Sequence, residues 1–197
     1  MSEARPPRKR RKPKPVTPDR LRKAALSYID RYATSAANLR EVLRRRIRRS
    51  TRLHGTDPEE GEAWIDDIVN DFLTRKLVDD RLFAETRAVS LHRSGASRRK
   101  IEMSLKTKGV GPADIAAALE SLERADPDAE FTAACRHAQR RGLGPWRREG
   151  RTERRDRDLA AMARAGFGFQ MASKVIDAPD IDTLEAEAEQ RAAERNA

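Results

Sequence analysis

An internal repeat constrains the fold of this 197-residue chain more than any other feature. A shift of 62 residues places Ser35 on Ser97 and Leu39 on Ile101. In both copies a helical apolar pattern ends before the serine, and a second one follows with apolar residues four and eight positions later. A serine at such a junction accepts a hydrogen bond from the first turn of the helix that it starts. The repeat therefore predicts short helical units that bury their apolar faces against neighbouring units.

Prolines mark the starts of several predicted helices. Proline in the first helical turn loses no hydrogen bond, because the N–H at that position has no acceptor within the helix. Sustained alternation of polar and apolar residues is missing, so no strand is expected. The chain is predicted to be all-α, with about nine helices and a tail. The four dipeptides that mark helix starts are Thr17-Pro18, Asp57-Pro58, Gly111-Pro112 and Asp126-Pro127.

The predicted organisation is three tandem three-helix repeats in an elongated array. The repeats span residues 17–78, 79–125 and 126–178, the third being the most degenerate. Residues 1–16 contain seven cations and four prolines, which predicts a disordered basic arm. Residues 179–197, rich in Glu and Ala, predict an acidic C-terminal tail that forms a frayed helix.

The composition of the chain indicates which partners and which cellular compartment to expect. The net charge of +10 favours a polyanion, either nucleic acid or an acidic protein surface near it, although an arginine-rich composition with no special partner is the alternative. The single cysteine permits no internal disulfide and agrees with a cytoplasmic location. No apolar stretch approaches the ~20 residues that span a bilayer, so no membrane partner is expected.

Clustered cations are the candidates for a partner-binding surface. Like charges four residues apart, such as Arg44 and Arg48, repel slightly, and an anionic partner would offset that repulsion. Stacked repeats would align such helices into one basic stripe, whereas ordinary solvated helix faces are the alternative. A fourth cluster, in 151–157, is weaker because acidic residues interleave with it. The candidates are Arg44, Arg45, Arg48, Arg49, Arg98, Arg99, Lys100, Lys106, Lys108, Arg140, Arg141, Arg147 and Arg148.

Nothing in the sequence points to catalysis. Asp79 and Asp80 are adjacent at a predicted helix start, where capping explains them better than metal binding does. The three histidines have no metal-ligand spacing relative to Cys135. P-loop and Gly-x-Ser-x-Gly motifs are missing. We therefore expect no catalytic residue, no metal and no cofactor.

Four segments together carry a resemblance to a known family. Residues 77–84 resemble the aspartate-then-Phe-Ala signature of the RecX family, and 97–110 resemble its basic helix ending in Lys-Gly-Val. Residues 24–43 look like its first repeat, and 164–167 look like its final Arg-x-Gly-Phe. Lys76 departs from the family pattern, which usually has glycine there.

The resemblance implies a non-enzymatic regulator of the RecA recombinase. Such proteins bind the RecA nucleoprotein filament and restrain its growth, ATP hydrolysis and strand exchange. The expected partner is thus the RecA filament, with single-stranded DNA as a second candidate, and the expected state is a monomer. The alternative, which shares the charge signal, is an independent basic helical protein that binds DNA or RNA.

Overall fold

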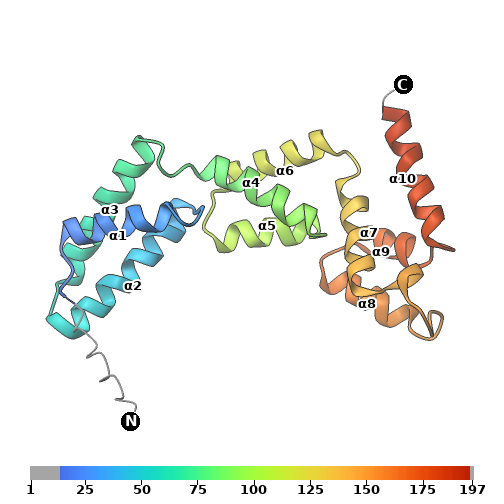
Figure 1. Ribbon diagram of the computed structural model, residues 1–197, viewed down its shortest axis with the longest axis horizontal. Helices are drawn as coiled ribbons and strands as arrows, with labels where there is room; N and C mark the ends of the chain where they lie inside the picture. The colour runs from blue at the N-terminus through green and yellow to red at the C-terminus, as the bar shows by residue number, and fades with distance from the viewer. Residues whose placement is uncertain (1–13, 196–197) are drawn as a thin grey trace, which may run out of the picture. The chain divides into compact units, whose positions relative to one another are not determined.

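The computed structural model describes residues 14–195, and it is entirely helical over that range (Figure 1). The all-α prediction is confirmed. Most of the predicted basic arm lies outside the described residues. The elements are α1 (Pro18–Ile29), α2 (Ala36–His54), α3 (Pro58–Thr74), α4 (Asp80–Arg93), α5 (Arg98–Thr107), α6 (Pro112–Ala125), α7 (Ala129–Arg141), the 3-10 helix η1 (Gly144–Trp146), α8 (Arg155–Arg164), α9 (Phe169–Ile176) and α10 (Ile181–Arg195).

The chain divides into two compact units. Of the described residues, the first unit comprises 14–33 and Asn38–Val78, and the second comprises Thr34–Ala37 and 79–195. The second unit contains both of the later predicted repeats, so the division into three repeats stays a prediction. The same holds for the elongated array.

The first unit is a three-helix bundle built on one apolar face of each helix. Its core includes Leu21 from α1, Leu39 and Leu43 from α2, and Ile65 and Phe72 from α3, all at most 1% exposed. This burial follows the spacing that the sequence shows. A glycine lets α2 and α3 approach closely. A Cβ added to Gly61 of α3 would lie 2.5 Å from a methyl group of Ile47.

Three of the four proline-marked helix starts are confirmed. Helices α1, α3 and α6 begin at Pro18, Pro58 and Pro112, and the Thr17 and Asp57 side chains accept hydrogen bonds from the first turns of their helices. The fourth prediction is wrong, because α7 begins at Ala129 and not at Pro127.

A turn around Asp126 delays the start of α7. The Asp126 side chain accepts from the N–H of Asp128 at 3.1 Å, and its carbonyl accepts from the N–H of Ala129 at 2.9 Å. A short acidic side chain bonded two residues ahead favours a turn over a helix. Pro127 therefore lies in a turn that precedes the helix.

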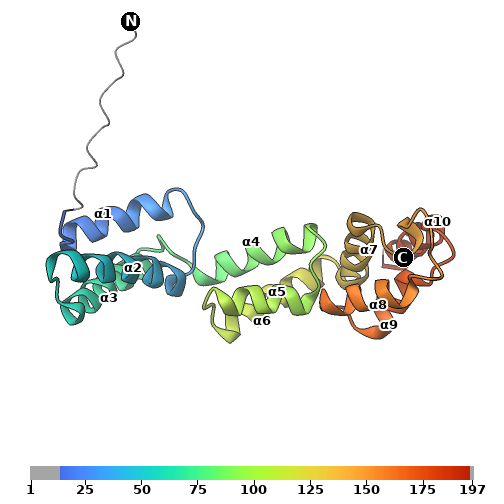
Figure 2. The same ribbon diagram turned by 90° about the horizontal axis from the view of Figure 1, so that it is seen from below.

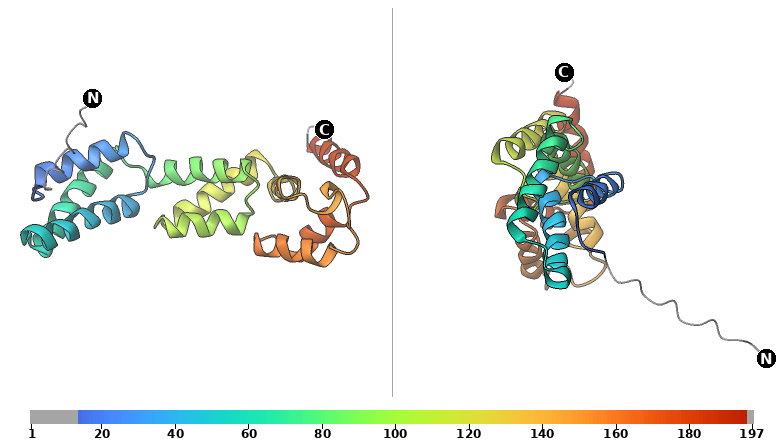
Figure 3. Two further views of the ribbon diagram at one scale, coloured as in Figure 1. Left: turned by 60° about the horizontal axis from the view of Figure 1, so that its bottom comes forward. Right: turned by 90° about the vertical axis from the view of Figure 1, so that its left-hand side faces the viewer.

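The second unit has two apolar cores. Helix α4 packs against α5 and α6 (Figure 2). The first core includes Ile101, Leu105 and Leu119. Helix α9 packs against α7 and α8 (Figure 3). The second core includes Phe131 and Met162. The core residues recur at helical spacing, as expected for helices that bury one face.

The C-terminal segment, expected as a frayed tail, forms the ordered helix α10. Leu184 is 3% exposed and belongs to the core around Phe131. The guanidinium of Arg191 lies 2.8 Å from the Asp128 carboxylate and over the Phe131 ring. One buried leucine and a charged side chain that stacks on an aromatic ring are enough to hold an otherwise polar helix.

Lys76 occupies a backbone conformation that favours glycine. Its φ is +54°, and it follows the C-cap residue Arg75 of α3. The N–H of Leu77 donates to the carbonyl of Phe72, and the N–H of Lys76 donates to Leu73, which is the Schellman pattern. A glycine would adopt this left-handed backbone without strain.

Two junctions in the second unit share one hydrogen-bond pattern. In the first, Ser35 Oγ donates to the carbonyl of Lys108, which precedes Gly109. The N–H of Ala36, at the start of α2, donates to Asp80 Oδ1 at 2.7 Å. Ser35 Oγ and the N–H of Ala36 thus bind a carbonyl and a carboxylate that lie further along the sequence.

The second junction shows the same pattern 62 residues later. Ser97 Oγ donates to the carbonyl of Ala165 at 2.7 Å and accepts from the N–H of Lys100 at 3.2 Å. The N–H of Arg98 donates to Glu130 Oε2 at 2.8 Å. The residue after the accepting carbonyl is Gly166, whose φ is +95° and whose added Cβ would lie 2.6 Å from Ser97 Oγ. The predicted capping role of Ser97 is confirmed, and the hydroxyl also joins α5 to the loop after α8.

Candidate partner-binding surface

The basic cluster on α2 separates into paired and unpaired arginines. Arg44 Nε lies 2.9 Å from Glu62 Oε2, and Arg48 Nη2 lies 2.6 Å from Glu41 Oε1. The hydrogen bond from Arg48 lowers the pKa of the Glu41 carboxyl. These two arginines are already neutralised by carboxylates of their own unit.

Four other arginines of α2 face solvent, whereas Arg40 pairs with Asp66. Arg45 and Arg49 are exposed, as are Arg46 and Arg52, and none of the four has an ion-pair partner within residues 14–195. Arg45, Arg49 and Arg52 follow the spacing i, i+4, i+7, so they share one helix face. This face is the part of the first cluster that can accept an external anion without breaking an existing pair.

The cluster on α5 is divided in the same way. Arg98 pairs with Glu123, and Lys106 Nζ lies 2.5 Å from Glu102 Oε1. The bond from Lys106 lowers the pKa of Glu102. Lys108 follows the last residue of α5, and its carbonyl accepts from Ser35. Arg99 and Lys100 are exposed and have no ion pair in the described part of the chain.

In the third cluster, Arg147 belongs to a buried ion pair. Its Nη2 and Nε atoms lie 2.5 Å and 3.0 Å from the two carboxylate oxygens of Asp158, which is 1% exposed. The N–H of Gly144 donates to the same carboxylate at 3.0 Å. Burial alone would raise the pKa of Asp158, but the bonds from Arg147 and Gly144 outweigh it and lower that pKa. Arg147 thus anchors the segment that contains η1.

The other three cations of the third cluster lie near the surface. Arg140 donates to the carbonyl of Ser94, while Arg141 and Arg148 are exposed without an ion-pair partner among the residues that the structure describes. The geometry thus favours Arg141 and Arg148 over Arg147 for contact with a partner.

One pocket gathers cations from two of the predicted clusters. A cavity of about 520 Å³ is lined by Lys100 of α5 and by His137, Arg140 and Arg141 of α7. The loop after α4 supplies Gly95 and Ala96 to its wall. His137 was not a candidate from the sequence, because no metal-ligand spacing includes it. Its nearness to Lys100 depends on the packing of α4 and the loop after it against α7, which no local pattern reveals.

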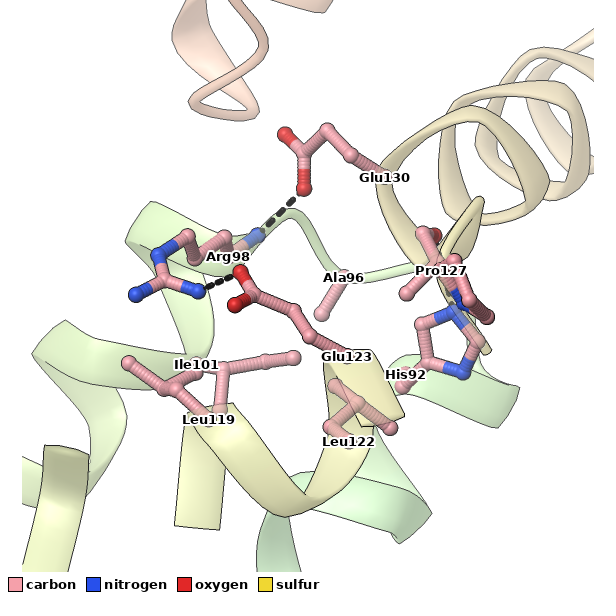
Figure 4. Close-up of a pocket in the computed structure, with 10 residues that line it drawn as sticks. His92, Ala96, Arg98, Ile101, Leu119, Leu122, Glu123, Pro127 and Glu130 are labelled. Atoms are coloured by element: carbon pink, nitrogen blue, oxygen red, sulfur yellow. Dashed lines mark hydrogen bonds and ion pairs between the residues drawn. The ribbon is translucent and has the colours of Figure 1, made fainter. Parts of the chain in front are cut away.

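A neighbouring pocket of about 280 Å³ contains both cationic and acidic side chains. The Arg98 guanidinium donates to Glu123, and the backbone N–H of Arg98 donates to Glu130, as Figure 4 shows. His92 is buried, and its Nε2 lies 2.8 Å from the carbonyl of Ala129. Burial raises the pKa of Glu130. Two carboxylates in a pocket with one guanidinium make it a poor site for a polyanion, and the backbone N–H of Arg98 belongs to the junction described above.

Residues 14–195 were compared with the requirements of a metal site and of a reactive cysteine. No group of three or more His, Cys, Asp or Glu side chains there could hold a metal ion. Burial raises the pKa of the half-buried Cys135 thiol to about 11, so the thiolate is scarce at neutral pH. No helix within this range combines the length and apolar character needed to cross a bilayer.

Comparisons with known proteins agree on one family. Residues 79–119 match the model of the second three-helix domain of RecX. Two similar relatives are the regulatory protein RecX of Myxococcus xanthus, at 40% identity over 90% of this chain and 98% of that protein, and the regulatory protein RecX of Agrobacterium fabrum, at 30% identity over 79% of this chain and 80% of that protein.

Solved structures show the same fold. A crystal structure of regulatory protein RecX aligns with a TM-score of 0.59 at 18% identity, covering 81% of this chain and 71% of that one. A crystal structure of RecX from Lactobacillus salivarius aligns with a TM-score of 0.57 at 15% identity, covering 81% of this chain and 94% of that one. The chain therefore belongs to the RecX family of regulatory proteins.

Proposed function

We propose that this protein regulates the RecA recombinase by binding the RecA nucleoprotein filament and restraining its growth, ATP hydrolysis and strand exchange. The observation that carries the proposal is the 40% identity with a regulatory protein RecX over 98% of that relative's length. The DNA in the filament is a polyanion, and a chain of net charge +10 suits it.

Unpaired cations are the best candidates for contact with the filament. A cation already bound to a carboxylate must lose that contact before it binds another anion, and this offsets the gain. Among the thirteen candidates, six have neither an ion pair nor a bond to a carbonyl within residues 14–195: Arg45, Arg49, Arg99, Lys100, Arg141 and Arg148. Several weak contacts on one molecule act together through high effective concentration.

Charge reversal on α2 tests this proposal. The double variant Arg45→Glu, Arg49→Glu should lose most of its inhibition of RecA ATPase on single-stranded DNA, because it converts two exposed cations into anions that the filament repels. Its helix content by circular dichroism should stay unchanged, since both side chains are exposed. A matched control, Lys23→Glu with Arg31→Glu, makes the same change in net charge on and just beyond α1 and should retain inhibition. Full inhibition by the α2 variant would remove this face from the binding surface.

Independent binding to DNA or RNA is the second candidate, favoured by the cation-lined pocket at α5 and α7. Inhibition through competition for DNA would need near-stoichiometric coating and would weaken steeply with salt. A regulator that acts on the filament should inhibit RecA at protein levels far below the number of DNA sites. A titration of ATPase rate at fixed DNA separates the two functions.

A further inference from the structure

We infer that the pocket between α5 and α7 binds phosphodiester groups of single-stranded DNA, through Lys100, His137, Arg140 and Arg141. The inference rests on the proposed function in one respect, because the RecA filament is where the protein would meet single-stranded DNA. Its direct test uses free oligonucleotide and no RecA.

The lining of the pocket is cationic without a neutralising acid. Its described residues include three long cationic side chains and one imidazole, and the rest are Leu91, Ser94, Gly95 and Ala96. The bond from Arg140 to the Ser94 carbonyl holds its guanidinium at the edge of the pocket. By contrast, the neighbouring pocket at Arg98 contains two carboxylates. Of these two pockets, only the one beside His137 presents uncompensated positive charge.

The wall of this pocket is built by a close backbone approach. Gly95 has a φ of +77°, and a Cβ added there would lie 2.9 Å from the backbone nitrogen of His137. Any larger residue would push the loop after α4 away from α7. The glycine thus keeps Lys100, which lies five residues later, close to the three basic residues of α7.

The pKa of His137 is sensitive to the positive charge around the pocket. Burial lowers the pKa of its imidazole, and Lys100, Arg141 and Arg140 lower it further. Removal of that positive field by a bound anion would favour the charged imidazolium. Anion binding should therefore raise the pKa of His137, which makes this residue a local probe.

The donor arrangement suits phosphate better than carboxylate. A carboxylate is planar, and the fork of one arginine satisfies it. A phosphodiester presents oxygens in several directions, and donors that converge from two helices match that distribution. Positive grooves that follow the backbone are also the general device for binding single strands.

The test measures the His137 resonance of the full chain by NMR while pH is varied. Oligothymidylate should raise the pKa of His137, and an oligoglutamate of matched charge should leave it unchanged at the same concentration and salt. The double variant Lys100→Gln, Arg141→Gln should bind oligothymidylate more weakly. The slope of log K against log salt concentration should become shallower by about 1.4, because each of the two lost phosphate contacts contributes about 0.7.

A control variant carries the same loss of charge outside the pocket. Arg93→Gln with Arg136→Gln removes two exposed cations from α4 and α7 and should keep most of the affinity. The inference is overturned if the control loses as much affinity as the pocket variant, if oligoglutamate shifts His137 equally, or if oligothymidylate leaves it unshifted.

The two proposals fail in distinguishable ways. If wild-type protein shifts His137 with oligothymidylate but does not inhibit RecA, the proposed function fails and the pocket assignment stands. If it inhibits RecA while oligothymidylate leaves His137 unchanged, the pocket assignment fails and the proposed function stands.

Discussion

Replacing Ser97 with alanine removes both hydrogen bonds of one junction hydroxyl. The Ser97 side chain is fully buried, accepts from the N–H of Lys100 and donates to the carbonyl of Ala165. Loss of a serine N-cap costs about 1 kcal/mol of unfolding free energy. Loss of the donor to a partly buried carbonyl costs about 1 kcal/mol more. We expect Ser97→Ala to destabilise the second unit by about 2 kcal/mol.

Urea unfolding in a Trp64→Phe background measures this loss, because the fluorescence then comes from Trp146, which lies in the second unit. Ser90→Ala in the same background is the control, since Ser90 is an exposed residue within α4 and alanine favours helix there. If the two variants agree within about 0.5 kcal/mol, the junction hydroxyl contributes no more than an ordinary surface serine.

Three further predictions concern backbone strain and pH. Gly166→Ala should lower the free energy of unfolding by about 2–3 kcal/mol, because φ is +95° and the new Cβ would meet Ser97 Oγ. The control Gly55→Ala has a φ of +71° but open space around the new Cβ, so it should lower this free energy by only about 1 kcal/mol. Equal losses in urea unfolding would mean that the contact with Ser97 is irrelevant. Lys76→Gly should raise the unfolding free energy by about 0.5–1 kcal/mol by relieving a left-handed backbone, and a loss of stability would contradict that reasoning. Asp158→Asn should lower the free energy of unfolding by about 3 kcal/mol at neutral pH, because the buried ion pair with Arg147 loses its negative charge. Since the folded pKa of Asp158 is lowered, its contribution is complete above the ordinary aspartate pKa of about 3.9 and disappears as pH falls through the folded value. The gap between wild type and this variant should therefore narrow in acid, and a constant gap would assign the loss to packing.

Local signals predicted the helices well. Proline in the first turn and a preceding capping residue located the starts of α1, α3 and α6, because both effects act within a few residues. The same rule failed at Pro127, where the Asp126 side chain stabilises a turn. The capping role of Ser97 was predictable, but its bond to Ala165 was not, since that contact spans 68 residues.

The functional surface was less predictable than the fold. Sequence clustering identified cations, but it could not tell Arg45 from Arg44, because the partner of Arg44 is Glu62 on the next helix. It likewise included Arg147, which a buried carboxylate holds. The pocket at His137 depends on a loop and two helices that meet through tertiary packing. Whether any of these cations contacts a partner stays a prediction.

The junctions of the second unit have a consequence for how such a chain can diverge. Each depends on a serine hydroxyl, one acidic oxygen, a main-chain carbonyl and a glycine. Main-chain carbonyls are supplied by every amino acid, so few identities must survive for the helices to keep meeting in this way. The outward faces of the same helices are then open to drift, and selection can redistribute their charges toward a changing partner while the architecture persists.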